Sequence, residues 1–223
     1  MNILLTNDDG HFANGILLMR EILSKFGRVV IVAPQEVMSA KSVAITLGRG
    51  VEVRKIKEDI YAMEGTPADC VAFGLSSLNI KFDLVVSGCN HGFNISYDTM
   101  YSGTIGACLQ ALTYRIPAIA FSGPSNLRLC EKHAEEVLKY IFDNKLLSTE
   151  YLLSINFPEG EEVKGIKMTE LYYRPENTYY IQETDDTYLA YRELNDEKCT
   201  EKNTDVYAIY HGYISITKLH KTL

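Results

Sequence analysis

The 223-residue sequence contains no tryptophan and few cysteines, and no apolar run approaches the roughly 20 residues of a membrane-spanning helix. The cysteines are odd in number and none forms a C-x-x-C pair, which argues against a disulfide framework and favours reduced thiols. Met1 leads within two residues into a short apolar run and then carboxylates, without the features of a secretory leader. We therefore expect a cytoplasmic protein that does not enter a membrane. The cysteines are Cys70, Cys89, Cys108, Cys130 and Cys199.

The chain also lacks an excess of positive charge. It has 22 lysines and arginines against 29 acidic residues, a formal net charge of -7. A protein that binds a nucleic-acid polymer needs a clustered basic surface, so we expect no such partner. A small phosphate ester is still possible, because one metal ion and a few backbone amides can hold it. H-E-x-x-H and G-x-G-x-x-G are both absent, which argues against a zinc hydrolase and a dinucleotide oxidoreductase.

The first 34 residues predict a strand–helix–strand unit. Residues 3–6 form a short apolar run, residues 16–26 carry apolar side chains at helical spacing, and residues 29–33 form a second apolar run ended by Pro34. Such a unit implies a parallel sheet. The fold class predicted is α/β: a Rossmann-like three-layer sandwich with a mainly parallel sheet and an extended C-terminal arm.

The remaining pattern predicts an α/β core over residues 1–165 and a C-terminal arm with closing strands over residues 166–223. Thr66, Pro67 and Asp69 read as the cap and first turn of a helix, with Asp69 structural rather than catalytic. Tyrosines between residues 171 and 191 indicate a subunit contact or, alternatively, base stacking. Strands are expected at 42–46 and 51–56 (an edge hairpin), 83–87, 118–122, 152–157, 206–209 and 213–217, and helices from 66 to 78, from 102 and over 131–142.

Polar residues follow several predicted strands. Asn7, Asp8, Asp9 and Gly10 come after the first, Ser39 lies beyond the second, and Asn90 follows the strand at 83–87. The carboxyl ends of parallel strands share one edge of the sheet, where ligands bind. Adjacent carboxylates repel one another unless a cation lies between them, and oxygen ligands suit Mg²⁺ or Mn²⁺. We predict one divalent cation at Asp8 and Asp9.

A helix start beyond that strand offers an anion site. Ser102, Gly103 and Thr104 present free amides and the positive end of a helix dipole, although a plain Ser/Thr cap explains the same residues. His91 adjoins Asn90 and could donate a proton or orient a ligand, or it could be an ordinary loop residue. His11 has the same ambiguity.

Several ordered segments resemble the SurE (stationary-phase survival protein) nucleotidase family, and together they are more specific than any single motif. The resemblance spans nearly the whole chain. The matching segments are residues 1–10, Ala33-Pro34 with Ser39, residues 65–71, residues 83–90 with Gly92 and Asn94, residues 101–107 and residues 116–122; weaker matches are Asn156 with Pro158 and residues 204–217.

The resemblance implies a metal-dependent phosphatase that hydrolyses nucleoside 5′-monophosphates, in some members also 3′-monophosphates and short polyphosphate. It implies Asp8, Asp9, Ser39 and Asn90 as metal ligands. His91 and Asn94 are our candidates for supporting those ligands. It also implies a homodimer or homotetramer built by exchange of C-terminal segments. The family's serine usually lies in an arginine-rich loop, whereas residues 35–41 here read Gln-Glu-Val-Met-Ser-Ala-Lys.

The predicted catalytic residues are Asp8, Asp9 and Asn90, with Asn7, Ser102, Gly103 and Thr104 binding phosphate. Attack by water is favoured over an aspartyl nucleophile because the D-x-D spacing of aspartyl-phosphate phosphatases is absent, although a nucleophilic or basic role for an aspartate stays open. The alternative is a non-enzymatic Mg²⁺-binding module like a response-regulator receiver. That class needs an aspartate where residues 87–90 stand, and a lysine after residues 118–122.

Overall fold

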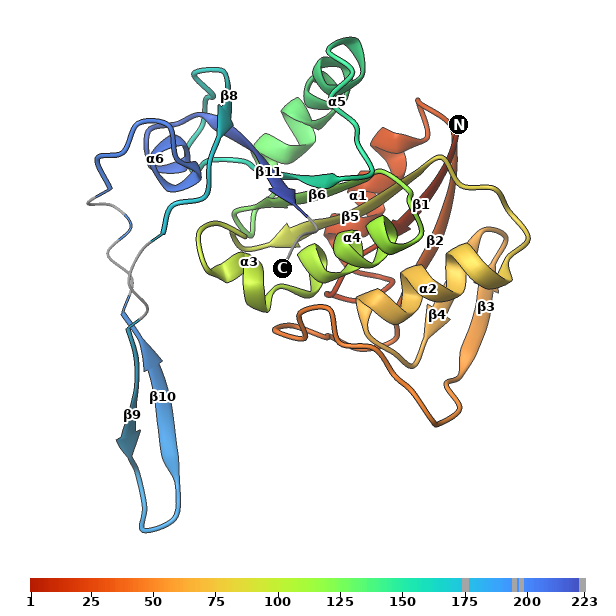
Figure 1. Cartoon of the computed structure of the whole chain (residues 1–223), viewed down its shortest axis with the longest axis horizontal. Coiled ribbons are helices and arrows are strands. Elements are labelled where there is room, and N and C mark those ends of the chain that lie inside the picture. The colour runs from red at the N-terminus through yellow and green to blue at the C-terminus, as the bar shows by residue number, and fades with distance from the viewer. Residues whose placement is uncertain (174–176, 194–195, 197–198, 221–223) are drawn as a thin grey trace.

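The computed structural model describes residues 1–173, 177–193, 196 and 199–220. A central sheet of nine strands runs through the body, in the order β3-β4-β2-β1-β5-β6-β7-β11-β8 (Figure 1). Neighbouring strands from β4 to β7 are parallel, whereas β3 and β11 pair antiparallel with β4 and β7. The strands are β1 (Asn2–Thr6), β2 (Arg28–Pro34), β3 (Val53–Lys57), β4 (Ile60–Met63), β5 (Leu84–His91), β6 (Ala118–Gly123), β7 (Tyr151–Asn156), β8 (Ile166–Thr169) and β11 (Ile214–His220).

Helices cover both faces of this sheet, which confirms the predicted three-layer α/β architecture. Successive residues of β1 point to opposite faces: Ile3 packs with α1 and α5, whereas Leu4 packs with α2 and α4. Both core clusters are fully buried, so continuous apolar strands are needed for β1, β2 and β5. The helices are α1 (Asn14–Leu23), α2 (Pro67–Ser77), α3 (Asp98–Tyr101), α4 (Gly103–Thr113), α5 (Arg128–Asp143) and α6 (Asp205–Tyr210).

The start of α2 follows the predicted capping chemistry. The Thr66 hydroxyl accepts from the Asp69 amide at 3.1 Å, and the Asp69 carboxylate accepts from the Thr66 amide at 2.9 Å. This reciprocal capping box confirms the structural interpretation of Asp69.

Two predicted strands are wrong. Residues 42–46 form no strand: Ser42 and Val43 lie in a turn, where Ser42 has a φ of 51° and its amide donates to the Tyr101 carbonyl. The edge hairpin is made by β3 and β4 instead. Residues 206–209 are helical, because Thr204 caps α6 by accepting from the Tyr207 amide. Among smaller differences, α1 ends at Leu23, short of the predicted Phe26.

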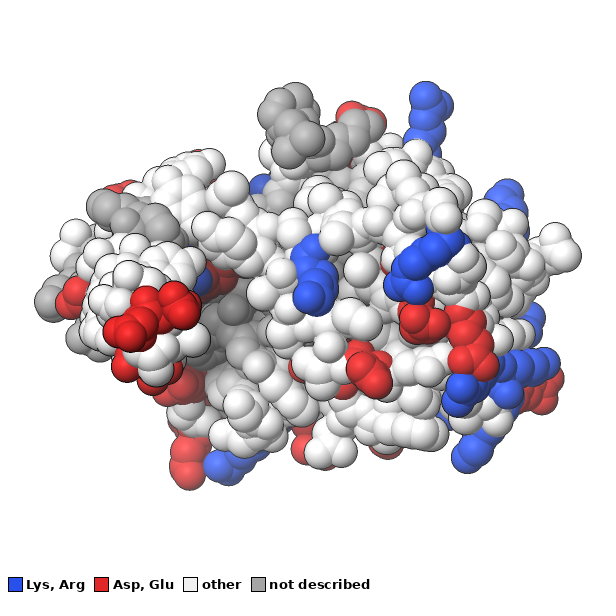
Figure 2. All heavy atoms as spheres, turned by 90° about the horizontal axis from the view of Figure 1, so that it is seen from below, with Lys and Arg blue, Asp and Glu red and all other residues white. Residues whose placement is uncertain are grey.

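The arm contains a separate two-stranded hairpin made by β9 (Thr178–Gln182) and β10 (Tyr188–Arg192). It projects from the body in Figure 1, and its turn falls at Asp185-Asp186. Figure 2, which views the molecule from below, shows acidic atoms at the tip of this hairpin and lysines and arginines dispersed among acidic side chains on the body.

Candidate active site at the carboxyl edge of the sheet

Asp8 joins three segments that lie far apart in the sequence. It follows β1 and is buried, with 4% of its surface exposed. Its Oδ1 accepts from the Thr104 hydroxyl at 2.6 Å, and its carbonyl accepts from the Met38 amide at 2.7 Å. The end of β1, the first turn of α4 and the loop after β2 therefore meet at one carboxylate.

The electrostatics of Asp8 favour a nearby cation. Burial raises the pKa of Asp8 from 3.8 to about 6; the Thr104 hydrogen bond opposes this shift, and the charge of Asp9 adds to it. Within the described residues, neither Asp8 nor Asp9 forms an ion pair with a basic side chain. A divalent cation would supply the missing positive charge.

Asp9 follows β1, and Asn90 lies near the end of β5, the strand that pairs with β1. The His91 amide donates to Asp9 Oδ2 at 3.4 Å. Asn90 lies inside β5 rather than in the following loop, and its Nδ2 donates to the Gly92 carbonyl at 3.0 Å. The nitrogen of that amide is engaged, so its oxygen is the atom suited to a metal. His91 contacts Asp9 through its backbone, and its side chain lies at the exposed end of β5.

Ser39 and the start of α4 border the same corner. Ser39 is exposed and follows Met38, whose amide is bonded to Asp8. The Ser102 hydroxyl caps α4 by accepting from the Ile105 amide at 3.2 Å. A β-carbon at Gly103 would lie 3.0 Å from the Asp8 β-carbon and 3.2 Å from the Met38 carbonyl oxygen. Glycine therefore allows the helix to start directly against the carboxylate.

The remaining predicted residues have varied surroundings. Asn7 donates to the Gly10 carbonyl at 2.9 Å, and its buried Oδ1 has no hydrogen-bond partner among the described residues. Asn94 donates to the Ser122 hydroxyl at 2.8 Å and accepts at its backbone oxygen from Asn156, so it fastens the loop after β5. The His11 ring lies 3.3 Å from the Pro34 carbonyl oxygen.

The donor set suits a hard divalent cation. The described part of the chain has no group of three or more His, Cys, Asp and Glu side chains that could hold a metal. The candidate ligands are instead two carboxylates, one hydroxyl and one amide oxygen, the chemistry preferred by Mg²⁺ and Mn²⁺. The Asn7 oxygen without a hydrogen-bond partner and the two neighbouring carboxylates fit such an ion.

Two contacts of Asp8 were not predicted from the sequence. The Met38 amide and the Thr104 hydroxyl both hold Asp8, whereas Thr104 was predicted to bind phosphate. The position of Thr104 in the first turn of α4 gives no signal that its hydroxyl contacts Asp8. In a separate observation, no helix in the described ranges has the length and hydropathy to cross a membrane.

Comparisons with known proteins agree with this architecture. Residues 3–178 match the family described as Survival protein SurE. The chain is 37% identical to "5'-nucleotidase SurE" of Clostridium botulinum, covering 100% of this chain and 94% of that protein. It is 39% identical to the protein of the same name from Acinetobacter baylyi, covering 98% and 93%. The crystal structure of the SurE protein from Aquifex aeolicus superposes with a TM-score of 0.89 at 35% identity, covering 100% of this chain and 94% of that one.

The fold and site together define a Rossmann-like α/β protein with an acidic corner where the first strand meets the start of a helix. With the family match and these identities, the chain belongs to the SurE family.

Proposed function

We propose that the protein is a 5′-nucleotidase that hydrolyses nucleoside 5′-monophosphates to nucleoside and phosphate with one Mg²⁺ or Mn²⁺ per chain. The relatives' name, 5'-nucleotidase SurE, supports the reaction class. The observation that carries the proposal is Asp8: a buried carboxylate beside Asp9, held against a helix start, with no basic ion-pair partner in the described residues. That arrangement suits a cation and a phosphate together.

The ligands proposed for the cation are the carboxylates of Asp8 and Asp9, the Ser39 hydroxyl and the Asn90 amide oxygen. When bound, the ion supplies a water of lowered pKa and polarises a phosphate oxygen. The Thr104 hydroxyl holds one oxygen of Asp8 in place, which orients the other.

The phosphate is proposed to lie at the start of α4. The first amides of a helix lack partners within it, and the helix dipole favours an anion there. The amides of Gly103 and Thr104 and the side chains of Asn7 and Ser102 are the candidate phosphate ligands, and they would stabilise the charge that develops during attack by water. His91, at the exposed end of β5, is the candidate proton donor to the leaving nucleoside oxygen.

A receiver-like signalling module is the less supported candidate. Its phosphate-accepting aspartate would lie at the end of β5, where this chain has Asn90 and His91, and β6 ends at Gly123 without a lysine. The 5′-nucleotidase proposal predicts phosphate release from AMP that stops with EDTA and returns with Mn²⁺ or Mg²⁺. Turnover that continues unchanged in EDTA would contradict the metal assignment.

We also propose that residues 166–223 mediate a homodimer or homotetramer. Six apolar side chains of the β9–β10 hairpin are 38% to 67% exposed, and an isolated two-stranded hairpin is marginally stable in water. Burial against a second subunit would remove this apolar surface from water. The six are Tyr179, Tyr180, Ile181, Tyr188, Leu189 and Tyr191.

A further inference from the structure

A hollow opens beside the corner around Asp8. It has a volume of about 460 Å³, within the range of small-molecule sites, and lies between the loop after β2 and the segment from β4 to α2. Met38 lines it and also bonds to Asp8, so one residue links the hollow to the proposed metal site. A ligand with its phosphate at the start of α4 could place its remaining part here.

The walls of this hollow are fixed before any ligand binds. Thr46 and Thr66 line it, and both are tied to Asp69: the Thr46 amide and hydroxyl donate to its carboxylate at 2.8 and 2.7 Å. Burial opposes ionisation of Asp69, but the hydrogen bonds from Thr46 and Thr66 outweigh it and hold the pKa of this carboxyl below its usual value. The backbone N–H of Gln35 also donates to the Met63 carbonyl at 2.9 Å, which joins the loop after β2 to the end of β4.

The side chain of Gln35 provides a polar group for a ligand in this hollow. It lines the hollow, and its buried Nε2 has no hydrogen-bond partner among the described residues. A buried donor without a partner is unfavourable unless a ligand completes it. Met38 and Met63 add apolar, adaptable surface suited to a flat ring.

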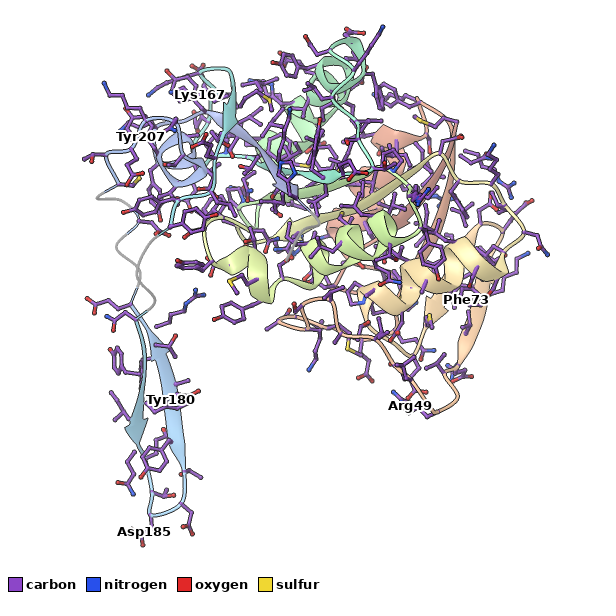
Figure 3. The ribbon with its side chains drawn as sticks, viewed as in Figure 1. Arg49, Phe73, Lys167, Tyr180, Asp185 and Tyr207 are labelled. Atoms are coloured by element: carbon purple, nitrogen blue, oxygen red, sulfur yellow. The ribbon has the colours of Figure 1, made fainter. Side chains whose placement is uncertain are left out.

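The charge of the hollow selects against a second phosphate. Two acidic residues line it, Glu36 and Glu64, against the single basic Arg49. Arg49 already pairs with Glu64 at 3.1 Å, which leaves Glu36 uncompensated among the lining residues. Figure 3 shows Arg49 on the loop that precedes β3. An uncharged nucleoside fits this environment, whereas a phosphate chain would be repelled.

We propose that this hollow is the nucleoside subsite, that Gln35 hydrogen-bonds the base or ribose, and that Glu36 disfavours polyphosphate. The inference rests on the proposed phosphatase activity and concerns which substrates that activity prefers. A larger cavity of about 1220 Å³ lies between α4 and the strands β8 and β11, but among the described residues neither Met38 nor Thr104, the two partners of Asp8, lines it.

The test compares AMP with p-nitrophenyl phosphate, which has no nucleoside. In Gln35→Ala, the ratio of kcat/KM for AMP to that for p-nitrophenyl phosphate should fall about 10-fold, as expected for one lost hydrogen bond. Gln110→Ala, a half-buried glutamine on α4 outside both cavities, should keep the wild-type ratio. An unchanged ratio in Gln35→Ala would overturn the subsite, whereas wild-type protein inactive on both substrates would overturn the phosphatase proposal itself.

Two further measurements keep the inference independent of catalysis. Adenosine should bind the EDTA-treated wild type in a calorimetric titration and bind Gln35→Ala about 10-fold more weakly; equal affinity would count against Gln35. Glu36→Lys should raise tripolyphosphate hydrolysis relative to AMP about 3-fold, whereas Glu21→Lys, exposed on α1, should not. A Glu36→Lys variant without this change would refute the charge argument.

Discussion

The corner around Asp8 and the β9–β10 hairpin depart from ordinary burial in opposite directions. At the corner, a carboxylate that is 4% exposed sits beside a second acid. On the hairpin, Tyr180 is 67% exposed and its neighbours are similarly open to water. The proposed cation would offset the buried charge, and the proposed second subunit would cover the apolar surface.

The largest expected effect follows from removing the charge at the corner. Asp8→Asn should lower kcat/KM for AMP by at least about 100-fold, because partners of metal ligands alone are worth 10 to 100-fold and Asp8 is proposed as a ligand itself. Steady-state kinetics with saturating Mn²⁺ measure this. Asp143→Asn, an exposed aspartate at the end of α5, serves as the control and should behave as wild type.

The corner should also affect stability as pH changes. The pKa of Asp8 in the folded protein, about 6, lies above the ordinary 3.8, so the folded state binds this proton more tightly than the unfolded state does. The resulting stability is present in full below pH 3.8 and is lost as pH rises through 6, up to about 3 kcal/mol.

Denaturant melts of EDTA-treated protein at pH 4 and pH 7 measure this effect. Other carboxyls titrate in the opposite sense, such as Glu135, whose two lysine hydrogen bonds lower its pKa to about 2. The prediction therefore concerns the difference between wild type and Asp8→Asn. Asp8→Asn should gain stability relative to wild type between pH 4 and pH 7, and a constant difference would show that Asp8 is not perturbed.

The hairpin half of the comparison is tested by association. Replacing both Tyr180 and Tyr188 with serine should weaken the oligomer by about 2 kcal/mol or more, because tyrosines are frequent hot spots of interfaces. Sedimentation velocity over a range of concentrations measures this shift. Tyr114→Ser, at an exposed tyrosine next to α4 and outside the hairpin, should leave the oligomer unchanged. A wild-type protein that is monomeric at all concentrations would remove the basis for this role of the arm.

The smallest effect concerns the hydroxyl that orients Asp8. Thr104→Val keeps the shape but removes the 2.6 Å hydrogen bond, and activity should fall about 10-fold with a higher Mn²⁺ requirement. Thr113→Val removes a hydroxyl bond to the Gln110 carbonyl at the opposite end of the same helix and should have little effect. Equal activities of the two variants would show that Thr104 acts only as a core residue.

Much of the fold could be predicted because its strongest signals are local. The apolar runs that form β1 and β2 can be recognised from residues that are neighbours in the chain, and so can the capping residues of α2 at Thr66. The segment 206–209 was misread because four apolar residues fit either structure, and the Thr204-Asp205 cap decides for a helix.

The site was only partly predictable for the opposite reason. Asp8, Asp9 and Asn90 follow from the rule that parallel strands end at a common edge. The Met38 amide and the half-buried Gln35 belong to an irregular loop, whose path depends on contacts with segments distant in sequence, such as the end of β1 and the start of α4. Their roles required the three-dimensional structure.

Direct titration of Mn²⁺, followed by electron paramagnetic resonance, tests most directly whether Asp8 and Asp9 share a cation. The wild type should bind one Mn²⁺ per chain, and the Asp8→Asn, Asp9→Asn double variant should lose that binding while keeping its circular dichroism spectrum. Binding of Mn²⁺ to the double variant with wild-type affinity would contradict the account.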